Sequence, residues 1–232
     1  MTTDLVTDPE SYLFVTEVGS RMWGMEKFAS DYDLFHVYQT PASEFLISGN
    51  FGNTKAAKIW TDPQNREIDA QYMEIGHLVG LLKKGNVNAI WAVCSGVVHK
   101  DTEVLRQLKH ITLQNLSKAS YQSIRGMAIS QLKDAEKRKE VKDPQKSLVT
   151  CQRTLLFGIK LLYGEGVDFK ASWPMFEITK EACEANFIDL DVALQCSKLP
   201  EFPNPKHFDN FIYRLRMQEI LDNNVKLDIK AI

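Results

Sequence analysis

Gly19-Ser20-Arg21 is followed by Asp31-Tyr32-Asp33-Leu34, with ten residues between Ser20 and Asp31. Residues at i and i+2 of a strand point to the same face, so a strand here places both aspartates side by side. Their oxygens suit Mg²⁺, and a Gly-Ser turn lets phosphate oxygens approach the backbone N–H groups closely. This stretch therefore predicts a site for a divalent metal and a triphosphate.

A third carboxylate is expected from Asp69, which follows Ile68 and precedes Ala70 in a short strand-like segment. Glu67 shares its face by the same alternation. In phosphoryl transfer with two metal ions, a third acid can hold the second ion and activate the attacking hydroxyl. The alternative for Asp69 is a surface residue that caps the following helix.

Four basic residues are candidates for binding the nucleotide. Arg21 directly follows the Gly-Ser turn and could clamp a phosphate with two hydrogen bonds. Lys118 and Lys146 each begin a predicted helix, where a positive charge is unfavourable unless an anion is near. Arg153 lies two turns into the second of these helices. Solvated surface lysines, and an ion pair at the edge of the core for Arg153, remain the alternatives.

The composition is that of a globular chain without a strong charge bias. It has 232 residues, 44% of them hydrophobic, and a net charge of −2 from 28 basic and 30 acidic residues. Any nucleic-acid contact therefore needs a local basic patch, for which the run 133–146 is the candidate. The four cysteines lack the spacing of a zinc site or a disulfide framework. The start of the chain lacks the pattern of a signal peptide, and no apolar run is long enough to span a membrane, so we expect a cytoplasmic protein.

The pattern predicts a mixed α/β fold (α+β), with the strands in the first third of the chain. Short segments rich in β-branched and aromatic residues are expected to form a small mixed sheet. The strand expectations cover residues 33–38, 44–48, 56–60 and 67–70, and residues 12–18 are expected to form a strand or a helix that turns into a strand.

From residue 71 the hydrophobic period changes to that of helices. Helices are expected over residues 71–82, 102–116, 117–139, 145–163, 173–187 and 206–223. We therefore divide the chain into a catalytic core, residues 1–100, and a C-terminal helical subdomain, residues 101–232.

Together, Gly19-Ser20, the ten-residue spacing and Asp31-Tyr32-Asp33-Leu34 resemble the signature of the DNA polymerase beta-type nucleotidyltransferase superfamily. The whole stretch 19–33 is similar to a branch sometimes found beside RNA ligases, in RNA repair. The similarity continues at Asp69, in the segments 81–88 and 121–131, and at Lys146 and Arg153, so it covers roughly residues 10–168. The chain departs from the branch at Thr150, where many members have His, and at Val87, where Pro is usual.

The resemblance implies a small mixed sheet with flanking helices and a helical region that closes over a nucleotide. It implies transfer of a nucleoside monophosphate from an NTP to an acceptor, dependent on Mg²⁺ or Mn²⁺, with release of pyrophosphate. Asp31 and Asp33 match the paired metal ligands, Gly19 and Ser20 the phosphate turn, and Asp69 the third acid.

The acceptor is left open by the sequence. An RNA 3′ end fits the resemblance, and a protein side chain or a small molecule fits the motif equally. A different class of function, a regulatory module that binds nucleotide without turnover, is the alternative to an enzyme. Neither the choice of NTP nor the oligomeric state follows from the sequence.

Overall fold

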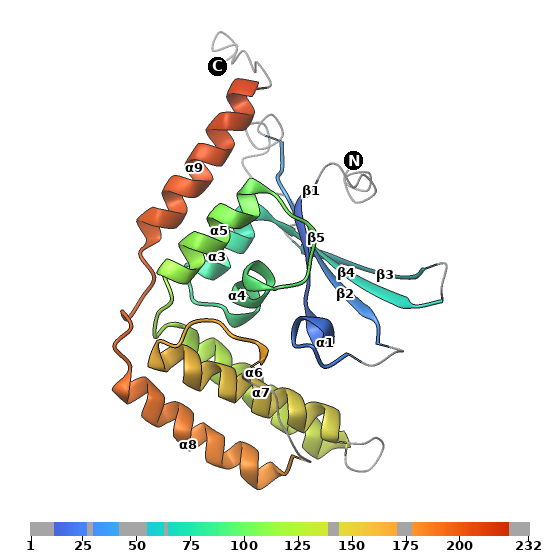
Figure 1. Ribbon diagram of the computed structural model, residues 1–232, viewed down its shortest axis with the longest axis vertical. Coiled ribbons are helices and arrows are strands. Elements are labelled where there is room, and N and C mark those ends of the chain that lie inside the picture. The colour runs from blue at the N-terminus through green and yellow to red at the C-terminus, as the bar shows by residue number, and fades with distance from the viewer. Residues whose placement is uncertain are drawn as a thin grey trace.

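The computed structural model describes residues 12–26, 30–41, 55–62, 65–138, 144–170 and 178–222. Its centre is a five-stranded mixed sheet with the strand order β3-β4-β2-β1-β5 (Figure 1). The strands are β1 Tyr12–Glu17, β2 Tyr32–Tyr38, β3 Lys55–Thr61, β4 Glu67–Glu74 and β5 Val98–Lys100. The β2 and β4 strands run parallel to each other, and the other neighbouring pairs are antiparallel. The mixed α/β fold predicted from the sequence is confirmed.

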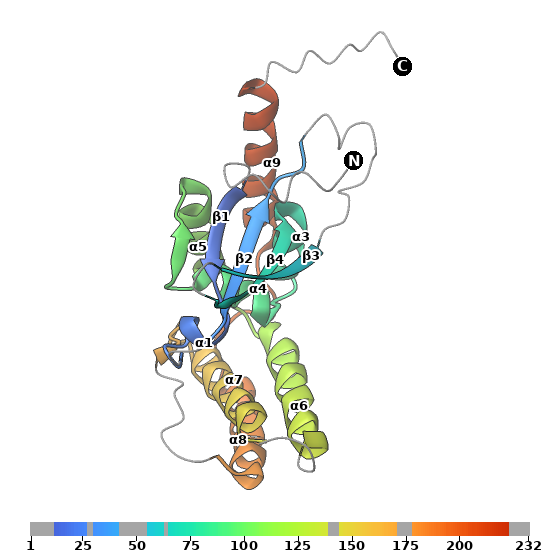
Figure 2. The same cartoon turned by 90° about the vertical axis from the view of Figure 1, so that its right-hand side faces the viewer.

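The helices fall into two groups around this sheet. Near the sheet lie α1 Gly19–Met22, α3 Ile75–Leu82, α4 Val87–Cys94, α5 Glu103–Gln114 and α9 Pro205–Asp222. A second group consists of α6 Ser120–Arg138, α7 Gln145–Tyr163 and α8 Lys180–Cys196, which pack on one another. In the turned view this second group extends from the end of the sheet at which α1 lies (Figure 2).

Alternation along β2 creates two different faces of the sheet. Phe35 and Val37 point into the main core, which the helices cover. On the other face His36 stacks on Tyr72, with ring centroids 4.8 Å apart, within a smaller cluster around Tyr12. Asp33 shares the parity of Phe35 and Val37, so it belongs to the helix-covered face.

Two expected helices have wrong boundaries. The helix expected from residue 71 begins at Ile75, because residues 71–74 continue β4 and pair with β2, while residues 71–73 also pair with β3. The Glu74 carboxylate then caps α3 by accepting a hydrogen bond from the Gly76 N–H. The helix expected over residues 173–187, of which 173–177 lie outside the described residues, begins at Lys180 and continues to Cys196, since Thr179 is extended and its side chain caps α8.

The remaining expected helices and strands, and the expected domain division, have different outcomes. The helices expected over residues 102–116, 145–163 and 206–223 are confirmed within two residues at each end. The sequence reading placed no element at α4 or β5. The expected strand at residues 44–48 lies outside the described residues. The division at residue 100 stays a prediction, because α5 packs on β1 and α4 while α6, α7 and α8 form the separate group.

The described cysteines are free, and Cys94, Cys151 and Cys183 are buried. None of the helices in the part of the chain that the structure describes has the length and hydrophobicity that a membrane span requires.

Candidate active site

Two of the predicted acids lie side by side on neighbouring strands. Asp33 near the start of β2 is in register with Asp69 on the parallel strand β4. Residues in register on adjacent strands share a face and lie about 5 Å apart. Asp31 precedes β2 and is close enough to Asp33 to raise the pKa of that carboxyl, after the larger effect of burial. The strand register therefore brings Asp33 and Asp69 together at one end of the helix-covered face, with Asp31 nearby.

The Gly-Ser turn lies directly against one of these acids. Gly19 has φ +65°, and a Cβ atom placed on it would lie 1.7 Å from Oδ2 of Asp33. The turn is also tied to the strand by a 2.8 Å hydrogen bond from the Val18 N–H to the Asp33 carbonyl. Glycine is therefore required at position 19 both by the backbone conformation and by the carboxylate packed on it.

The electrostatics of the acids favour a bound cation. Burial, followed by repulsion from Asp31 and Asp69, raises the pKa of Asp33 to about 6, while Lys146 opposes the shift. Carboxylates that repel one another in this way are suited to share a divalent cation with oxygen ligands. Among the described residues, no group of three or more acidic, histidine or cysteine side chains lies close enough together to hold a metal ion. Phosphate oxygens of a substrate are the further ligands that Mg²⁺ commonly takes.

Arg153 brings a buried positive charge to this end of the sheet. Its guanidinium lies 5.1 Å from the centre of the Trp23 ring, close to the turn. Burial lowers its pKa to about 10, and the charge of Asp33 opposes that shift. Its Nε is buried and has no hydrogen-bond partner in the described part of the chain. A buried donor without a partner is costly, so this group is ready to bind an anion.

The two predicted lysines lie in different places. Lys146, the second residue of α7, is close enough to Asp33 to lower its pKa. Lys118 instead forms a 2.8 Å ion pair with Glu201, and its backbone N–H donates to the Pro200 carbonyl. None of the contacts found among the described residues brings Lys118 to the acids.

Arg21 is engaged by the protein itself. Its guanidinium donates to the backbone carbonyls of Ser30, at 3.1 Å, and Asp31, at 3.4 Å. It also lies 4.0 Å from the centre of the Tyr32 ring. These contacts join the helical turn after Gly19 to the segment that carries Asp31, so the residue is positioned to brace the site.

Glu17 completes this brace, and sequence reasoning missed it. The side chain is 2% exposed, forms an ion pair with Arg21 Nε at 3.0 Å and is hydrogen-bonded to His99 Nε2 at 2.7 Å. The sequence signal that could have identified Glu17 is its charge near the end of the apolar segment 12–18. His99 lies on β5, the short strand that the sequence did not predict.

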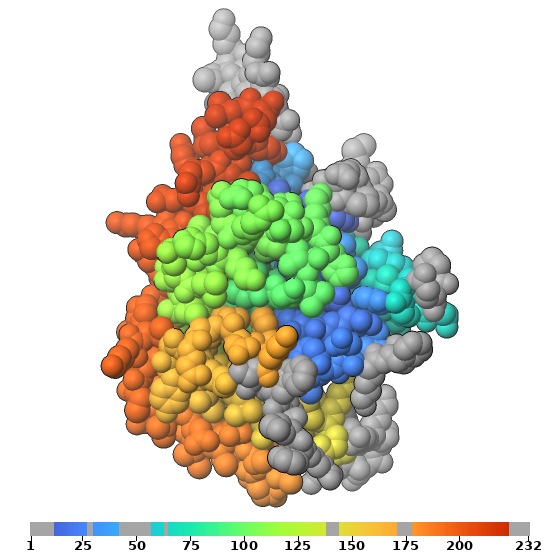
Figure 3. Space-filling view, in the orientation of Figure 1, coloured from blue at the N-terminus to red at the C-terminus, as the bar shows by residue number. Residues whose placement is uncertain are grey.

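The N-terminal segment that carries the Gly-Ser turn lies beside the helical group, since Arg153 of α7 lies over the Trp23 ring. In the space-filling view, the blue N-terminal segment that carries α1 lies between the green surface around α5 and the yellow-orange helical group (Figure 3). Lys146 and Arg153, both on α7, accordingly interact electrostatically with Asp33.

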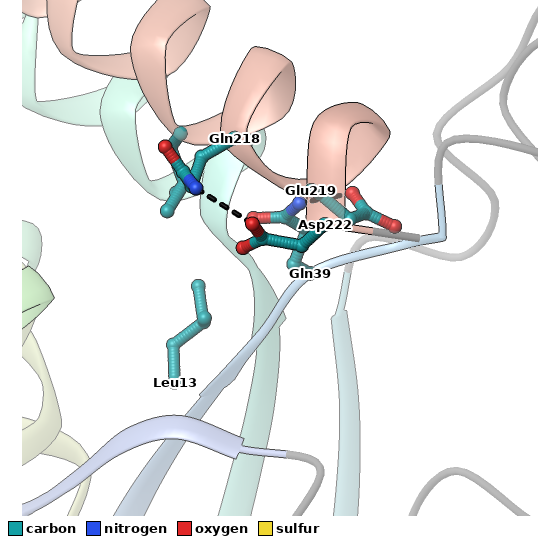
Figure 4. Close-up of a pocket in the computed structure, with 6 residues that line it drawn as sticks. Leu13, Gln39, Gln218, Glu219 and Asp222 are labelled. Atoms are coloured by element: carbon teal, nitrogen blue, oxygen red, sulfur yellow. Dashed lines mark hydrogen bonds between the residues drawn. The ribbon is translucent and has the colours of Figure 1, made fainter. Parts of the chain in front are cut away.

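A cavity of about 390 Å³ lies elsewhere, between α9 and the far end of β2 (Figure 4). It is lined by Leu13, Gln39, Leu215, Gln218, Glu219 and Asp222. Gln39 lies six residues beyond Asp33, which in a strand corresponds to about 20 Å. This cavity is therefore separate from the three acids.

A mixed sheet that carries acids on neighbouring strands, beside a Gly-Ser turn, defines the chain as a nucleotidyltransferase of the polymerase beta type. The model of the RNA repair pathway DNA polymerase beta family matches residues 7–184. The chain therefore belongs to that family, and the resemblance found in the sequence is confirmed.

The comparisons with solved structures and with curated proteins do not extend this family assignment. The chain is similar to a nucleotidyltransferase-like protein from Exiguobacterium sibiricum 255-15, with a TM-score of 0.35 and 10% sequence identity, over 90% of this chain and 75% of that chain. A similarity of that size carries no conclusion here. No curated protein matches the sequence.

Proposed function

We propose that the protein transfers a nucleoside monophosphate from an NTP to an acceptor hydroxyl and releases pyrophosphate, with an RNA 3′ end as the acceptor. The observation that carries this proposal is the packing of the Asp33 carboxylate on Gly19, with Asp69 in register on the next strand. The family's place in RNA repair supports the choice of acceptor.

The donor set fits Mg²⁺ or Mn²⁺, because Asp31, Asp33 and Asp69 offer carboxylate oxygens. Burial, followed by repulsion from Asp31 and Asp69, raises the pKa of Asp33. When bound, the metal would neutralise charge on the phosphates and lower the pKa of the acceptor hydroxyl. The backbone of Gly19 and Ser20 permits close approach of the triphosphate. Arg153 offers an unused buried donor, and Lys146 adds a second positive charge near Asp33.

In the proposed reaction the acceptor oxygen attacks the α-phosphorus of the NTP. The new oxygen–phosphorus bond forms as the bond from the α-phosphorus to the bridging oxygen breaks, and pyrophosphate leaves with that electron pair. Asp69, in register with Asp33, would accept the proton of the acceptor hydroxyl. The protein contributes chiefly position and charge, as is general for phosphoryl transfer.

The test is transfer of label from each α-³²P-labelled NTP to RNA, with pyrophosphate release measured in parallel. We expect equal amounts of both products from the wild type and none from Asp33→Asn. Asp189→Asn, which makes the same change on α8, should retain activity. Nucleotide binding without either product would contradict an enzyme and favour a regulatory module, whereas label on protein or a small molecule would contradict RNA as the acceptor.

A further inference from the structure

Residues in register form a row across β2, β4 and β3 at the position of Asp33 and Asp69. Asp33 on β2 is in register with Asp69 on β4, and Asp69 is in register with Ile59 on β3. Residues that are opposite one another on neighbouring strands share a face. The row therefore runs from Gly19, packed on Asp33, through Asp69 to Ile59 at the edge of the sheet.

The chemistry of the transfer indicates from which end of this row the acceptor approaches. This inference rests on the proposed function. In an in-line displacement the attacking oxygen and the leaving pyrophosphate lie on opposite sides of the α-phosphorus. The phosphate turn at Gly19 occupies one end of the row. The acceptor must then approach from the other end, across Ile59.

Ile59 has the exposure that a docking residue needs. Its side chain is 63% exposed, although it is a large aliphatic residue beside an acid at the site. β4 is the only neighbour of β3 among the described strands, and Ala57, Lys58 and Thr61 are exposed as well. A substrate can therefore reach this strand without displacing any described element.

The other face of the same strand carries a cation and an aromatic ring. Lys58 Nζ lies 5.8 Å from the centre of the Trp60 ring. A positive charge combined with an aromatic and an apolar contact surface is typical of single-stranded nucleic-acid binding, in which phosphates meet the cation and bases stack.

We propose that the edge formed by Lys58, Ile59 and Trp60 binds the 3′-terminal segment of a single-stranded nucleic-acid acceptor. Ile59 contacts the terminal nucleoside and directs its hydroxyl toward Asp69. Lys58 binds a phosphate of the same strand. The edge thereby selects an acceptor with a polyanionic backbone over an uncharged one.

The test compares Michaelis constants for a single-stranded RNA oligonucleotide and for the NTP in matched variants. Ile59→Asp places a negative charge on the acceptor path, so we expect the KM for RNA to rise about tenfold or more with little change in the KM for NTP. Ile188→Asp is the control, because Ile188 on α8 is 67% exposed and lies outside the row. Equal RNA KM values for these two variants would overturn the proposal.

Salt dependence gives a second readout that does not depend on folding. If Lys58 neutralises one phosphate, Lys58→Ala should reduce the slope of log K for RNA against log salt by about one. Lys206→Ala, at an exposed position on α9, should leave the slope unchanged. An unchanged slope in Lys58→Ala would contradict the proposal while leaving the transferase assignment intact. Failure of the wild type to transfer label would instead overturn the proposed function and this inference with it.

Discussion

At Gly19 two constraints fall on one residue. The positive φ angle disfavours any side chain, and the Asp33 carboxylate occupies the space where a Cβ atom would lie. The phosphate turn and the first acid are thus built as one unit, although thirteen residues, 20–32, separate them in the sequence. A substitution at Gly19 should therefore shift the Asp33 carboxylate.

Gly19→Ala is expected to lower the transfer rate about a hundredfold or more, because a shift of about 1 Å in a reacting group has an effect of that size. Gly80→Ala is the matched control, since a Cβ atom at Gly80 would meet nothing within 4 Å. Single-turnover rates measure the effect. Equal rates for the two variants would show that the contact between Gly19 and Asp33 does not matter for catalysis.

The raised pKa of Asp33 predicts a pH-dependent cost to stability. Its pKa of about 6 in the folded protein lies above the ordinary value of 3.8, so the folded state binds this proton more tightly than the unfolded state. The charged carboxylate therefore destabilises the fold above about pH 6, and the cost disappears as the pH falls to about 4.

In EDTA, Asp33→Asn should accordingly melt at a higher temperature than the wild type at pH 8, and the difference should shrink toward pH 4. Mg²⁺ should raise the melting temperature of the wild type and have little effect on the variant. Thermal scans at several pH values, with Asp189→Asn beside them, measure this. A variant that is less stable than the wild type at pH 8 would contradict the electrostatic explanation.

Among the elements, α7 holds the helical group together by close packing at Gly158. A Cβ atom there would lie 2.6 Å from Cγ2 of Ile124 on α6 and 2.9 Å from Cδ1 of Leu190 on α8. The absence of a side chain at this position thus allows three helices to meet. Since α7 also carries Lys146 and Arg153, its placement sets where these cations lie relative to the acids.

Gly158→Ala should destabilise the protein by about 1–3 kcal/mol through overpacking. Gly126→Ala on α6 should instead stabilise it by about 0.5–1 kcal/mol, because a Cβ atom there meets nothing and alanine favours helix. Urea denaturation of the two variants gives both free energies. Changes of the same sign in both would contradict this packing.

The α9 helix is anchored to the sheet by a buried ion pair between Arg216 and Glu74. Glu74 is fully buried, and Arg216 also donates to the Thr40 carbonyl at 2.9 Å. Arg216→Met should cost about 3–5 kcal/mol, because it leaves a buried carboxylate without its cation. Arg214→Met, on the exposed side of the same helix, should cost little in the same denaturation experiment. A loss below 1 kcal/mol for Arg216→Met would contradict an anchoring role.

Over the whole molecule, the sequence predicted local features well and long-range contacts poorly. The Gly-Ser turn, the strand that begins after Asp31 and most helices follow from short-range patterns. The extension of β4 through Glu74 depends on pairing with two other strands, which outweighed the helical period of residues 71–74. The brace from Glu17 to Arg21 and His99 joins residues up to 82 positions apart, which no local pattern contains.

The positions of the candidate site residues relative to one another could also be learned only from the structure. Lys118 and Lys146 looked equivalent as starts of helices, yet one pairs with Glu201 and the other lies near Asp33. The row from Gly19 to Ile59 depends on the register of the strands, which could not be predicted from local sequence patterns. We therefore take the register of β3, β4 and β2 as the feature on which the functional account rests.

The most direct test of the account is a crystal structure with Mn²⁺ and a non-hydrolysable NTP analogue, read by anomalous scattering from the metal. The account predicts a Mn²⁺ ion bound by carboxylate oxygens of Asp31 and Asp33, with the triphosphate against Gly19 and the sugar toward Asp69. A metal and triphosphate bound elsewhere, such as in the cavity beside α9, with the three acids left without metal, would contradict it.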